Sequence, residues 1–436
     1  MRQLFGKVAV DEGYLSTSQL QQLLGIFGRE NHPAGAGRRL GDLAVALGFM
    51  TQPQVDEVIA KQAQGGEQST GAQPSLAASE SPRFKAPGGS GTSGAMVTDL
   101  VRSAISARAS DLHLHAGEPP FVRRAGRLVS GSAQPLPAAA LETALLGMMG
   151  PTFRQRLETA GQVDLCVPFD EGYRLRMNVF KERCGLCASV RIIAPTLPTI
   201  ERLNLPSAAA VLTTYHQGLV LVAGPAGCGK TTTLAALVDL INEQRPQHVV
   251  CLEDPIEFVY ESKVATITQR EIGTHTRSYG AALRAALRED PDIIVISELR
   301  DPEAISLALT AAETGHLVMG TIHTSSAVGT ISRLIEAFAG DEEAQVRAML
   351  AQSLRGVLCQ HLVPTVGGSV APMVELLVNN RAIGHCIRDN KLHQVQSLLQ
   401  TGASRHTVTR ADSLRALLQS GLITPKIHDA YSVTEE

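Results

Sequence analysis

The feature that most constrains this chain is a glycine-rich turn inside the segment LVLVAGPAGCGKTTTLAALVDLI, at residues 219–241. The apolar run before the turn predicts a buried strand, and leucine, valine and isoleucine at helical spacing after it predict a helix. The turn itself fits the pattern G-x-x-x-x-G-K-[ST] from Gly224 to Thr231. Glycines let backbone N–H groups approach a phosphate chain, and the positive end of a helix faces the same anion. The segment therefore predicts a phosphate-binding loop.

Two side chains of this loop have chemistry that a nucleotide needs. Lys230 supplies a positive charge for the β- and γ-phosphates, and the hydroxyl of Thr231 supplies a ligand for Mg²⁺. The alternative is an ordinary strand–turn–helix connection, but a chance match to the pattern has a probability on the order of a few per cent in a chain of this length. The predicted nucleotide-binding residues are Gly224, Pro225, Ala226, Gly227, Cys228, Gly229, Lys230, Thr231 and Thr232.

Acidic side chains follow two further apolar stretches. The segment VVCLEDPIEF places Glu253, Asp254 and Glu257 after one predicted strand, and DIIVISELRD places Glu298 after another. In doubly wound sheets, ligands bind outside the carboxyl ends of the strands, so both acidic sets are expected near the phosphates. One carboxylate can hold Mg²⁺ through water, while another orients the attacking water. Either cluster alone is more often a capped strand end, but two of them beside a phosphate loop favour hydrolysis.

Histidines and arginines provide further candidates for contact with the nucleotide. His316 and His323 flank a predicted strand in ETGHLVMGTIHTSS, where a histidine beside the nucleotide could sense the γ-phosphate. Arg174 and Arg176 alternate in YRLRMNVF and therefore share one face of a strand, and Arg191 lies on another strand. These arginines would form a cationic wall that closes on the phosphates. The alternative to nucleotide contact is that the histidines only pack against the core and that the arginines are solvated surface residues.

The beginning of the chain contains a repeat followed by a polar segment. Residues 5–24 align with residues 40–59, because Gly6 and Gly41 are separated by 41 − 6 = 35 positions and the other matches keep this offset. Each copy predicts helix, glycine turn and helix, with Ser16 or Thr51 as N-cap, and together they define a helical module at 1–62. Residues 63–95 are polar and rich in glycine and serine, which predicts a flexible linker.

The remainder of the chain changes its pattern twice. An amphipathic helix and short strands at 96–205 predict a small α+β domain. Alternating strands and helices at 206–369 predict a doubly wound α/β domain built around the phosphate loop. Residues 370–436 are expected to form a mostly helical C-terminal region. The predicted fold class is therefore α/β, with additional small domains on either side of the nucleotide-binding part.

Composition narrows the range of partners. A formal net charge of −3 argues against a broad nucleic-acid surface. No apolar run reaches the roughly 18 residues of a membrane span, and the first residues lack a signal-peptide pattern, so a cytoplasmic protein is expected. Seven scattered cysteines favour free thiols. The single C-x-x-C, Cys184 to Cys187, has no second pair, and the sequence therefore predicts no metal there.

Four motifs, in this order, resemble those of the PilT/GspE superfamily of secretion ATPases: GPAGCGKT, LEDPIEF, IIVISELRD and TGHLVMGTIHT. The resemblance extends from residue 96 to about residue 425. It implies a homo-hexameric motor with a RecA-like P-loop ATPase domain, a preceding PAS-like domain, and ATP and Mg²⁺ as cofactors. It also implies that Glu257 is the catalytic glutamate, that Glu298 is the Walker B glutamate and holds Mg²⁺ together with Thr231, and that His323 is the His-box histidine. Arg176 and Arg191 resemble the nucleotide-sensing arginines of the superfamily.

The resemblance also bears on the branch of the superfamily. Assembly-type members carry a four-cysteine insertion after the His box, and LRGVLCQHLVPTVGGSVAPMVELL has none, which favours the retraction branch. The signature of that branch is only partly present in AIGHCIRDNK at 382–391. The matching positions are Ala382, Ile383, Ile387, Arg388 and Lys391, and the departing ones are Gly384, His385, Cys386, Asp389 and Asn390.

The function implied by the resemblance is type IV pilus dynamics, with retraction and twitching motility as the leading interpretation. Such a motor would lie at the inner membrane through a pilus or secretion platform protein. The alternatives are a pilus assembly or type II secretion ATPase, a nucleotide-binding regulator that docks a partner, and a nucleic-acid-dependent ATPase, against which the net charge argues.

The N-terminal module resembles those of assembly-type ATPases, some of which bind cyclic di-GMP. Its second copy keeps RLG at 39–41 and is followed by Gln62, whereas the first copy lacks both features. Arg39 is the expected contact for cyclic di-GMP, since a guanidinium group suits both phosphate and guanine edges. A module that docks a protein is the alternative.

Overall fold

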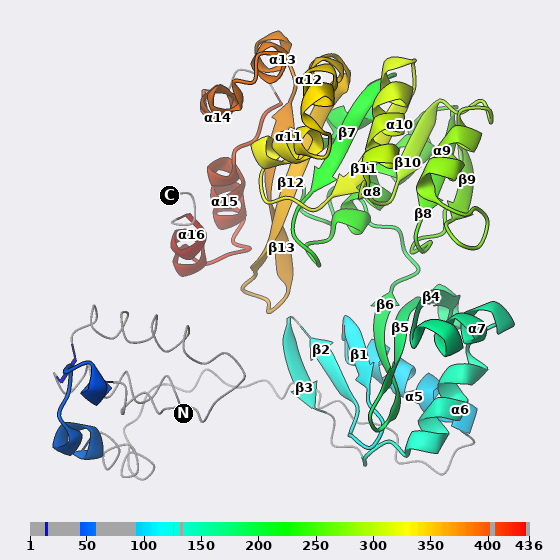
Figure 1. Ribbon diagram of the computed structural model, residues 1–436, viewed down its shortest axis with the longest axis vertical. Helices are drawn as coiled ribbons and strands as arrows, with labels where there is room; N and C mark the ends of the chain where they lie inside the picture. Colours follow the sequence, from blue (N-terminus) through cyan, green and yellow to red (C-terminus); the bar gives the residue numbers. More distant parts are fainter. Residues whose placement is uncertain are drawn as a thin grey trace. The chain divides into compact units, whose positions relative to one another are not determined.

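The computed structural model describes six stretches of the chain, namely residues 14–15, 44–57, 93–124, 126–130, 134–401 and 406–432 (Figure 1). The chain divides into two compact units, Met1–Ser81 and Pro82–Glu436, and the division falls within the predicted linker. Among the predictions made above, those for Ser16, Arg39 and Gln62 lie outside the described residues. None of the described helices is both long and apolar enough to cross a lipid bilayer.

The described part of the first unit brings the two copies of the repeat together. Thr51 precedes a helical segment at 52–57, and the Gln54 side chain accepts hydrogen bonds from the backbone N–H and the hydroxyl of Thr51 at 2.8 and 2.9 Å. This is half of a capping box, so the N-cap position predicted for Thr51 is confirmed. Tyr14 of the first copy donates a hydrogen bond to Glu57 of the second copy at 2.7 Å.

The second unit begins with a six-stranded sheet in the order β3-β2-β1-β6-β5-β4, in which every neighbouring pair is antiparallel. The alternation in β5 explains its two faces, because Leu175, Met177 and Val179 are fully buried while the residues between them are partly exposed. The elements of this part are α5 (Ser93–Ser106), β1 (Asp111–Leu114), β2 (Phe121–Arg124), β3 (Arg127–Ser130), α6 (Ala138–Gly147), α7 (Pro151–Ala160), β4 (Gln162–Pro168), η1 (Asp170–Gly172), β5 (Arg174–Glu182) and β6 (Gly185–Ile193).

A seven-stranded sheet follows, in the order β13-β12-β7-β11-β10-β8-β9. Its neighbouring strands are parallel except for β12 and β13. The elements are η2 (Ser207–Thr213), β7 (Gly218–Ala223), α8 (Lys230–Gln244), β8 (His248–Glu253), β9 (Thr266–Glu271), α9 (Tyr279–Ala286), β10 (Ile293–Ile296), α10 (Pro302–Glu313), β11 (Leu317–Ile322), α11 (Ala327–Glu336), α12 (Gly340–Ser353), β12 (Leu354–Pro364), β13 (Val370–Val378), α13 (Arg381–Arg388), α14 (Leu392–Gln400), α15 (Arg410–Gln419) and α16 (Pro425–Ser432).

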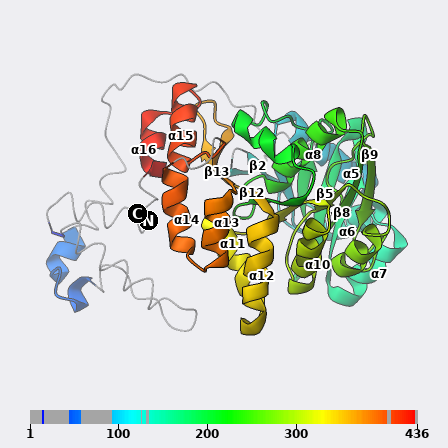
Figure 2. The same ribbon diagram turned by 90° about the horizontal axis from the view of Figure 1, so that it is seen from above.

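Helices cover both faces of this sheet. Val220 and Val222 of β7 belong to a core with α8 and η2, whereas Leu219 and Leu221 belong to a second core with α9, α10, α11 and α12. Figures 1 and 2 show α8 and α10 on opposite sides of the central strands. A strand buried on both faces has a continuous apolar sequence, as LVLVA of β7 does. The predicted doubly wound α/β fold is confirmed.

The C-terminal boundary of this domain differs from the prediction. Residues 370–378 form β13, which pairs with β12 from Gly356↔Val378 to Pro364↔Val370. The two strands are joined by a short turn in which Thr365 N–H donates to the Ser369 carbonyl at 2.9 Å. A boundary after residue 369 would cut this hairpin, so the sheet extends to Val378 and the helical region begins at α13. The apolar run in VAPMVELLV is the signal, because all of β13 except Val370 is buried.

Candidate nucleotide-binding site

The glycine-rich loop connects β7 to α8 and has a conformation that requires its glycines. Gly224, Gly227 and Gly229 have φ angles of +150°, +74° and +89°, which L side chains rarely adopt. A Cβ atom on Gly224 would lie 2.4 Å from the Cys228 sulfur and 2.4 Å from the Gln360 carbonyl oxygen. Gly229 is the N-cap of α8 and has no side chain to cap the helix, so the first N–H groups of α8 are left for an anion.

The remaining loop residues surround this turn. Pro225 and Ala226 are exposed, and Cys228 is buried below them. Burial raises the pKa of the Cys228 thiol, and the nearby charge of Lys230 opposes this shift. Thr231 and Thr232 are partly buried in the first turn of α8. The loop therefore presents mostly backbone to the surface, as a phosphate cradle requires.

Lys230 is buried and folds back over the loop. Its Nζ donates to the carbonyl oxygens of Gly224 and Pro225, each at 2.9 Å, and lies 3.1 Å from Nδ1 of His323. Burial lowers the pKa of Lys230, while negative neighbours including Glu298 raise it. The two carbonyl oxygens supply only partial negative charge, and phosphate oxygens are stronger partners for an ammonium group.

His323 connects Lys230 to the acidic group after β10. Its Nε2 lies 3.1 Å from Oε1 of Glu298, and Arg300 donates to Oε2 of Glu298 at 2.8 Å. Burial would raise the pKa of Glu298, but the hydrogen bond and charge of Arg300, with the charges of His323 and Lys230, lower it below the usual value. Glu298 is therefore a stable carboxylate. With the hydroxyl of Thr231 it offers the oxygen ligands that suit Mg²⁺.

The acidic residues after β8 lie in different environments. Glu253 is only 7% exposed and accepts a hydrogen bond from Gln269 at 2.8 Å. Its burial raises its pKa to about 7. Burial also raises the pKa of Asp254, although the positive charges of Arg300 and Arg176 partly lower it. Glu257 differs from both, because its carboxylate forms an ion pair with Arg176 from the six-stranded sheet.

The arginines on β5 both contact the segment that follows β8. Arg174 donates to the carbonyl oxygen of Ile256 at 3.0 Å, next to the ion pair between Arg176 and Glu257. The prediction that Arg174 and Arg176 share one face is thus confirmed. Arg191 lies directly opposite Arg176 on β6, but its Nε donates to Asp111 at 3.0 Å and its side chain is half-exposed. Arg191 therefore makes its ion pair within the six-stranded sheet.

The position predicted for His316 beside the nucleotide is wrong. His316 precedes β11, and its carbonyl accepts a hydrogen bond from Gly218 at the start of β7, whereas the phosphate loop follows the end of β7. At about 3.3 Å per residue, His316 and His323 lie roughly 20 Å apart along the strand. Only His323 is at the carboxyl edge of the sheet. His316 instead has its Nδ1 3.1 Å from the Ala311 carbonyl oxygen.

Gln360 supports the loop from β12 and was not among the residues predicted from the sequence. Its Oε1 accepts a hydrogen bond from Thr233 at 2.7 Å, and its Nε2 donates to the carbonyl oxygen of Cys228. Gln360 is 2% exposed and lies 132 positions after Cys228. The pairing of Cys359 with Ala223 brings it to the loop. A polar residue inside the apolar run of β12 was the signal available in the sequence.

Comparison with known proteins agrees with this geometry. Residues 89–424 match the family described as Type II/IV secretion system protein. The type IV pilus retractation ATPase PilT of Pseudomonas aeruginosa is 40% identical over 328 residues, which cover 75% of this chain and 95% of that protein. A twitching motility protein of Neisseria gonorrhoeae is 45% identical over 276 residues, covering 63% of this chain and 72% of that protein.

The fold has a counterpart among solved structures. The crystal structure of the pilus retraction motor PilT with bound ADP superposes with a TM-score of 0.68 at 40% identity, covering 76% of this chain and 95% of that one. Both PilT proteins align with this chain over nearly their whole length. This similarity agrees with the sequence motifs, the two sheets and the contacts at the loop. The chain therefore belongs to the type II/IV secretion system protein family, within the PilT/GspE superfamily of secretion ATPases.

Proposed function

We propose that this chain is the subunit of a homo-hexameric motor that couples ATP hydrolysis to type IV pilus retraction. The observation that carries the proposal is the continuous set of contacts from Lys230 through His323 to Glu298, at the carboxyl edge of the parallel sheet. These contacts join a phosphate-binding lysine to an ionised carboxylate, which are the two groups that an ATPase of this type needs. The pilus enters the proposal through the relatives described as PilT and as a twitching motility protein.

The loop residues would bind the nucleotide. Lys230 exchanges its two carbonyl partners for β- and γ-phosphate oxygens, while the free N–H groups of α8 donate to the phosphates. Thr231 and Glu298 would hold Mg²⁺, which neutralises phosphate charge when bound. His323 lies between Lys230 and Glu298, and it is therefore positioned to respond when either of them changes partner.

Glu257 is proposed to orient the attacking water. Its carboxylate is only 13% exposed and is held by Arg176, so the pair must loosen before Glu257 accepts a hydrogen bond from water. Arg176 then has a free guanidinium group to donate to phosphate oxygens. A movement of the six-stranded sheet that separates Arg176 from Glu257 would thus free the catalytic glutamate to bind the attacking water.

In a ring of subunits, the arginines of one subunit would supply further positive charge to the nucleotide of its neighbour. Arg191 is half-exposed and lies beside Arg176 on the same sheet face, where a neighbouring subunit's nucleotide can be contacted by both arginines. An arginine contributed by a second subunit stabilises the charge on a transferring phosphoryl group. We propose that each nucleotide lies between the seven-stranded sheet of one subunit and the six-stranded sheet of another.

Two observations favour retraction over assembly. In the described structure, β12 ends at Pro364 and β13 begins at Val370, and the short turn between them contains no four-cysteine insertion. In α13 the signature residues Ile383 and Ile387 are buried. Of the departing residues, His385 and Asp389 are exposed and alter the surface, whereas Gly384 and Cys386 are buried among the packing residues of α13.

The cellular setting follows from this function. We propose a cytoplasmic protein held at the inner membrane by a pilus platform protein, with residues 1–62 as a docking module. Cyclic di-GMP is a second candidate ligand of this module, with Arg39 as its proposed contact. The contact between Tyr14 and Glu57 joins the two copies of the repeat, as a single docking surface would require.

The proposal is tested with the full chain. Light scattering should give a hexamer in the presence of ATP and Mg²⁺, and phosphate release should be abolished by Lys230→Ala. The gene should restore twitching to a piliated, retraction-deficient strain, whereas the Lys230→Ala variant should not. A wild-type chain that hydrolyses ATP as a hexamer but restores only pilus assembly would refute retraction, and an inactive wild-type hexamer would refute the ATPase.

A further inference from the structure

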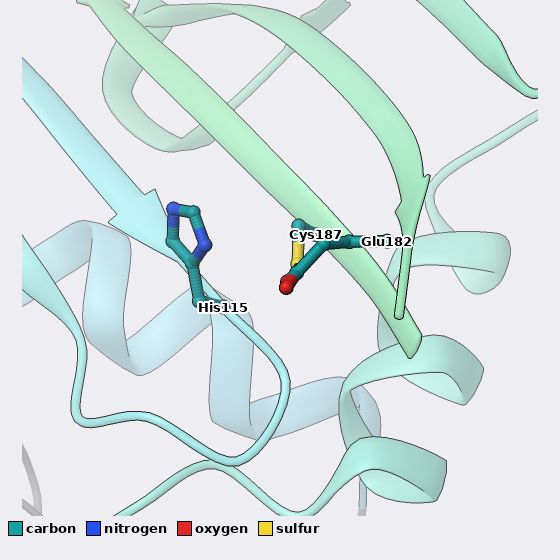
Figure 3. Close-up of side chains that lie close together, drawn as sticks. All are labelled: His115, Glu182 and Cys187. Atoms are coloured by element: carbon teal, nitrogen blue, oxygen red, sulfur yellow. The ribbon is translucent and has the colours of Figure 1, made fainter. Parts of the chain in front are cut away.

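Figure 3 shows a second cluster of reactive side chains, His115, Glu182 and Cys187. It lies at the last residue of β5, whereas Arg174 and Arg176 lie at the beginning of that strand. His115 directly follows β1, Glu182 is the last residue of β5, and Cys187 lies in β6. One donor atom from each of these three side chains lies within 4.8 Å of the others. The Cys187 thiol donates a hydrogen bond to Oε2 of Glu182 at 3.2 Å. The nucleotide site uses none of these residues.

The fold builds this cluster from two places in the sequence. Residues 183–184 form the two-residue turn between β5 and β6, and Gly185 follows with a φ of +136°. A Cβ atom on Gly185 would lie 3.2 Å from the Cβ of Ala116, so the glycine allows the hairpin to pack against the chain beside His115. This close approach brings the thiol and the carboxylate to the imidazole.

Two aromatic rings fix the orientation of His115. Its ring stacks on Phe121 at 5.4 Å between centroids, with an interplanar angle of 21°, and meets the edge of Phe180 at 6.2 Å. Within the described part of the chain, neither ring nitrogen of His115 has a hydrogen-bond partner. The imidazole is thus held in place by apolar contacts while both nitrogens remain able to bind a ligand.

The donor set matches a particular class of metal ion. Thiolate, imidazole and carboxylate are all zinc ligands, whereas the hard ions Mg²⁺ and Ca²⁺ prefer oxygen alone. Zinc–sulfur and zinc–nitrogen bonds of about 2.3 and 2.0 Å place tetrahedral donors roughly 3.5 Å apart, so the side chains need shifts of about 1 Å. The proton between Cys187 and Glu182 marks the side of the sulfur that a cation would occupy.

We propose that His115, Glu182 and Cys187 bind a zinc ion that ties the β5–β6 hairpin to the end of β1. The fourth position is left to water or to Cys184, which is exposed in the turn and has the C-x-x-C spacing to Cys187. The C-x-x-C motif predicted no metal because the chain has no second cysteine pair. The additional ligands come instead from a histidine and a glutamate.

The test measures zinc in the full chain. The purified protein is incubated with zinc chloride, dialysed against buffer that holds a weak chelator, and analysed for zinc by mass spectrometry. The wild type should retain about one zinc ion per chain, and His115→Ala, Cys187→Ser and Glu182→Gln should each weaken affinity by at least about tenfold. Because Glu182 is exposed, Glu182→Gln reports on the metal even if Cys187→Ser misfolds.

Matched controls separate metal binding from packing. His113 stacks on the same Phe121 at 4.8 Å but lies outside the cluster, and Cys386 is a buried thiol on α13. His113→Ala and Cys386→Ser should retain zinc. Cobalt added in place of zinc should give a thiolate charge-transfer absorption in the near ultraviolet that Cys187→Ser lacks. A wild-type chain with no bound zinc, or equal zinc in His115→Ala and His113→Ala, would overturn the proposal.

Discussion

Arg176 on β5 forms an ion pair with Glu257, which lies 81 residues later in the segment after β8. Arg176 lies in the six-stranded sheet, whereas Glu257 lies in the loop that follows a strand of the seven-stranded sheet. Each is at least two-thirds shielded from solvent, with side-chain exposures of 33% and 13%. The attraction between two partly shielded charges is stronger than between two surface charges. Removing one partner leaves the other charge poorly solvated. The pair therefore restrains the glutamate that is proposed to activate water.

Replacing Glu257 by Gln should separate binding from hydrolysis. Glutamine keeps the size of the side chain and can still accept a hydrogen bond from Arg176, but it cannot act as a base. We expect ATP affinity within a few-fold of wild type and a kcat lower by roughly 100-fold or more. Nucleotide titration and steady-state phosphate release measure the two quantities. Undiminished turnover would move the water-orienting role to another carboxylate.

Replacing Lys230 by Ala should abolish nucleotide binding. The substitution removes the cation from a loop that is otherwise backbone, so affinity for ATP should fall by roughly 100-fold or more. Binding of a fluorescent ATP analogue is the measurement. Lys263→Ala is the control, because Lys263 forms its ion pairs with Asp239 and Glu243 and makes no contact with the loop. Equal affinity in the two variants would refute the loop assignment.

Replacing Gln360 by Ala should weaken the loop from beneath. The variant leaves the Cys228 carbonyl and the Thr233 hydroxyl without their partner, and a buried unsatisfied polar group costs about 1–3 kcal/mol. We expect a lower melting temperature without nucleotide and a smaller stabilisation on adding ATP, because a loosened loop binds the phosphates less tightly. Differential scanning fluorimetry measures both, with Gln352→Ala, an exposed position on α12, as control. A melting temperature equal to that of the control would show that Gln360 is dispensable.

Glu253 should make stability depend on pH. Burial raises its pKa to about 7 from an ordinary value of 4.5, so the folded chain binds this proton more tightly than the unfolded chain. This contribution is complete below pH 4.5 and is lost as pH rises to about 7. Glu253→Gln removes the titrating group but keeps an acceptor for Gln269. The variant should therefore lose less stability than wild type between pH 5 and pH 8, by roughly 1–3 kcal/mol.

Thermal melting at the two pH values tests this expectation, since every other titrating group is common to both proteins. Glu289→Gln serves as control, because Glu289 is a partly exposed partner of Arg270 and lies outside the Asp254–Glu257 segment. If Glu253→Gln and wild type show the same change in melting temperature between pH 5 and pH 8, Glu253 does not carry the pH dependence.

The sequence alone determined the phosphate loop and the arrangement of strands around it. The glycines at 224, 227 and 229 adopt positive φ angles that other residues avoid. The conformation of the loop therefore depends on residues that are close together in the sequence. The apolar runs of β7, β8, β10 and β11 predict buried parallel strands, and parallel strands bring their carboxyl ends to one edge. Glu298 and His323 could be placed beside Lys230 for this reason.

Only the tertiary structure decided which distant side chains meet. Strand pairing brings Gln360 to the loop, places His316 at the far end of β11, and turns Arg191 towards Asp111. Packing of the hairpin against Ala116 assembles the proposed zinc ligands. The local periodicity of a strand indicates which of its faces is buried. Which strand pairs with it, and in which register, depends on the packing of the whole core. The contacts between distant side chains follow from that pairing.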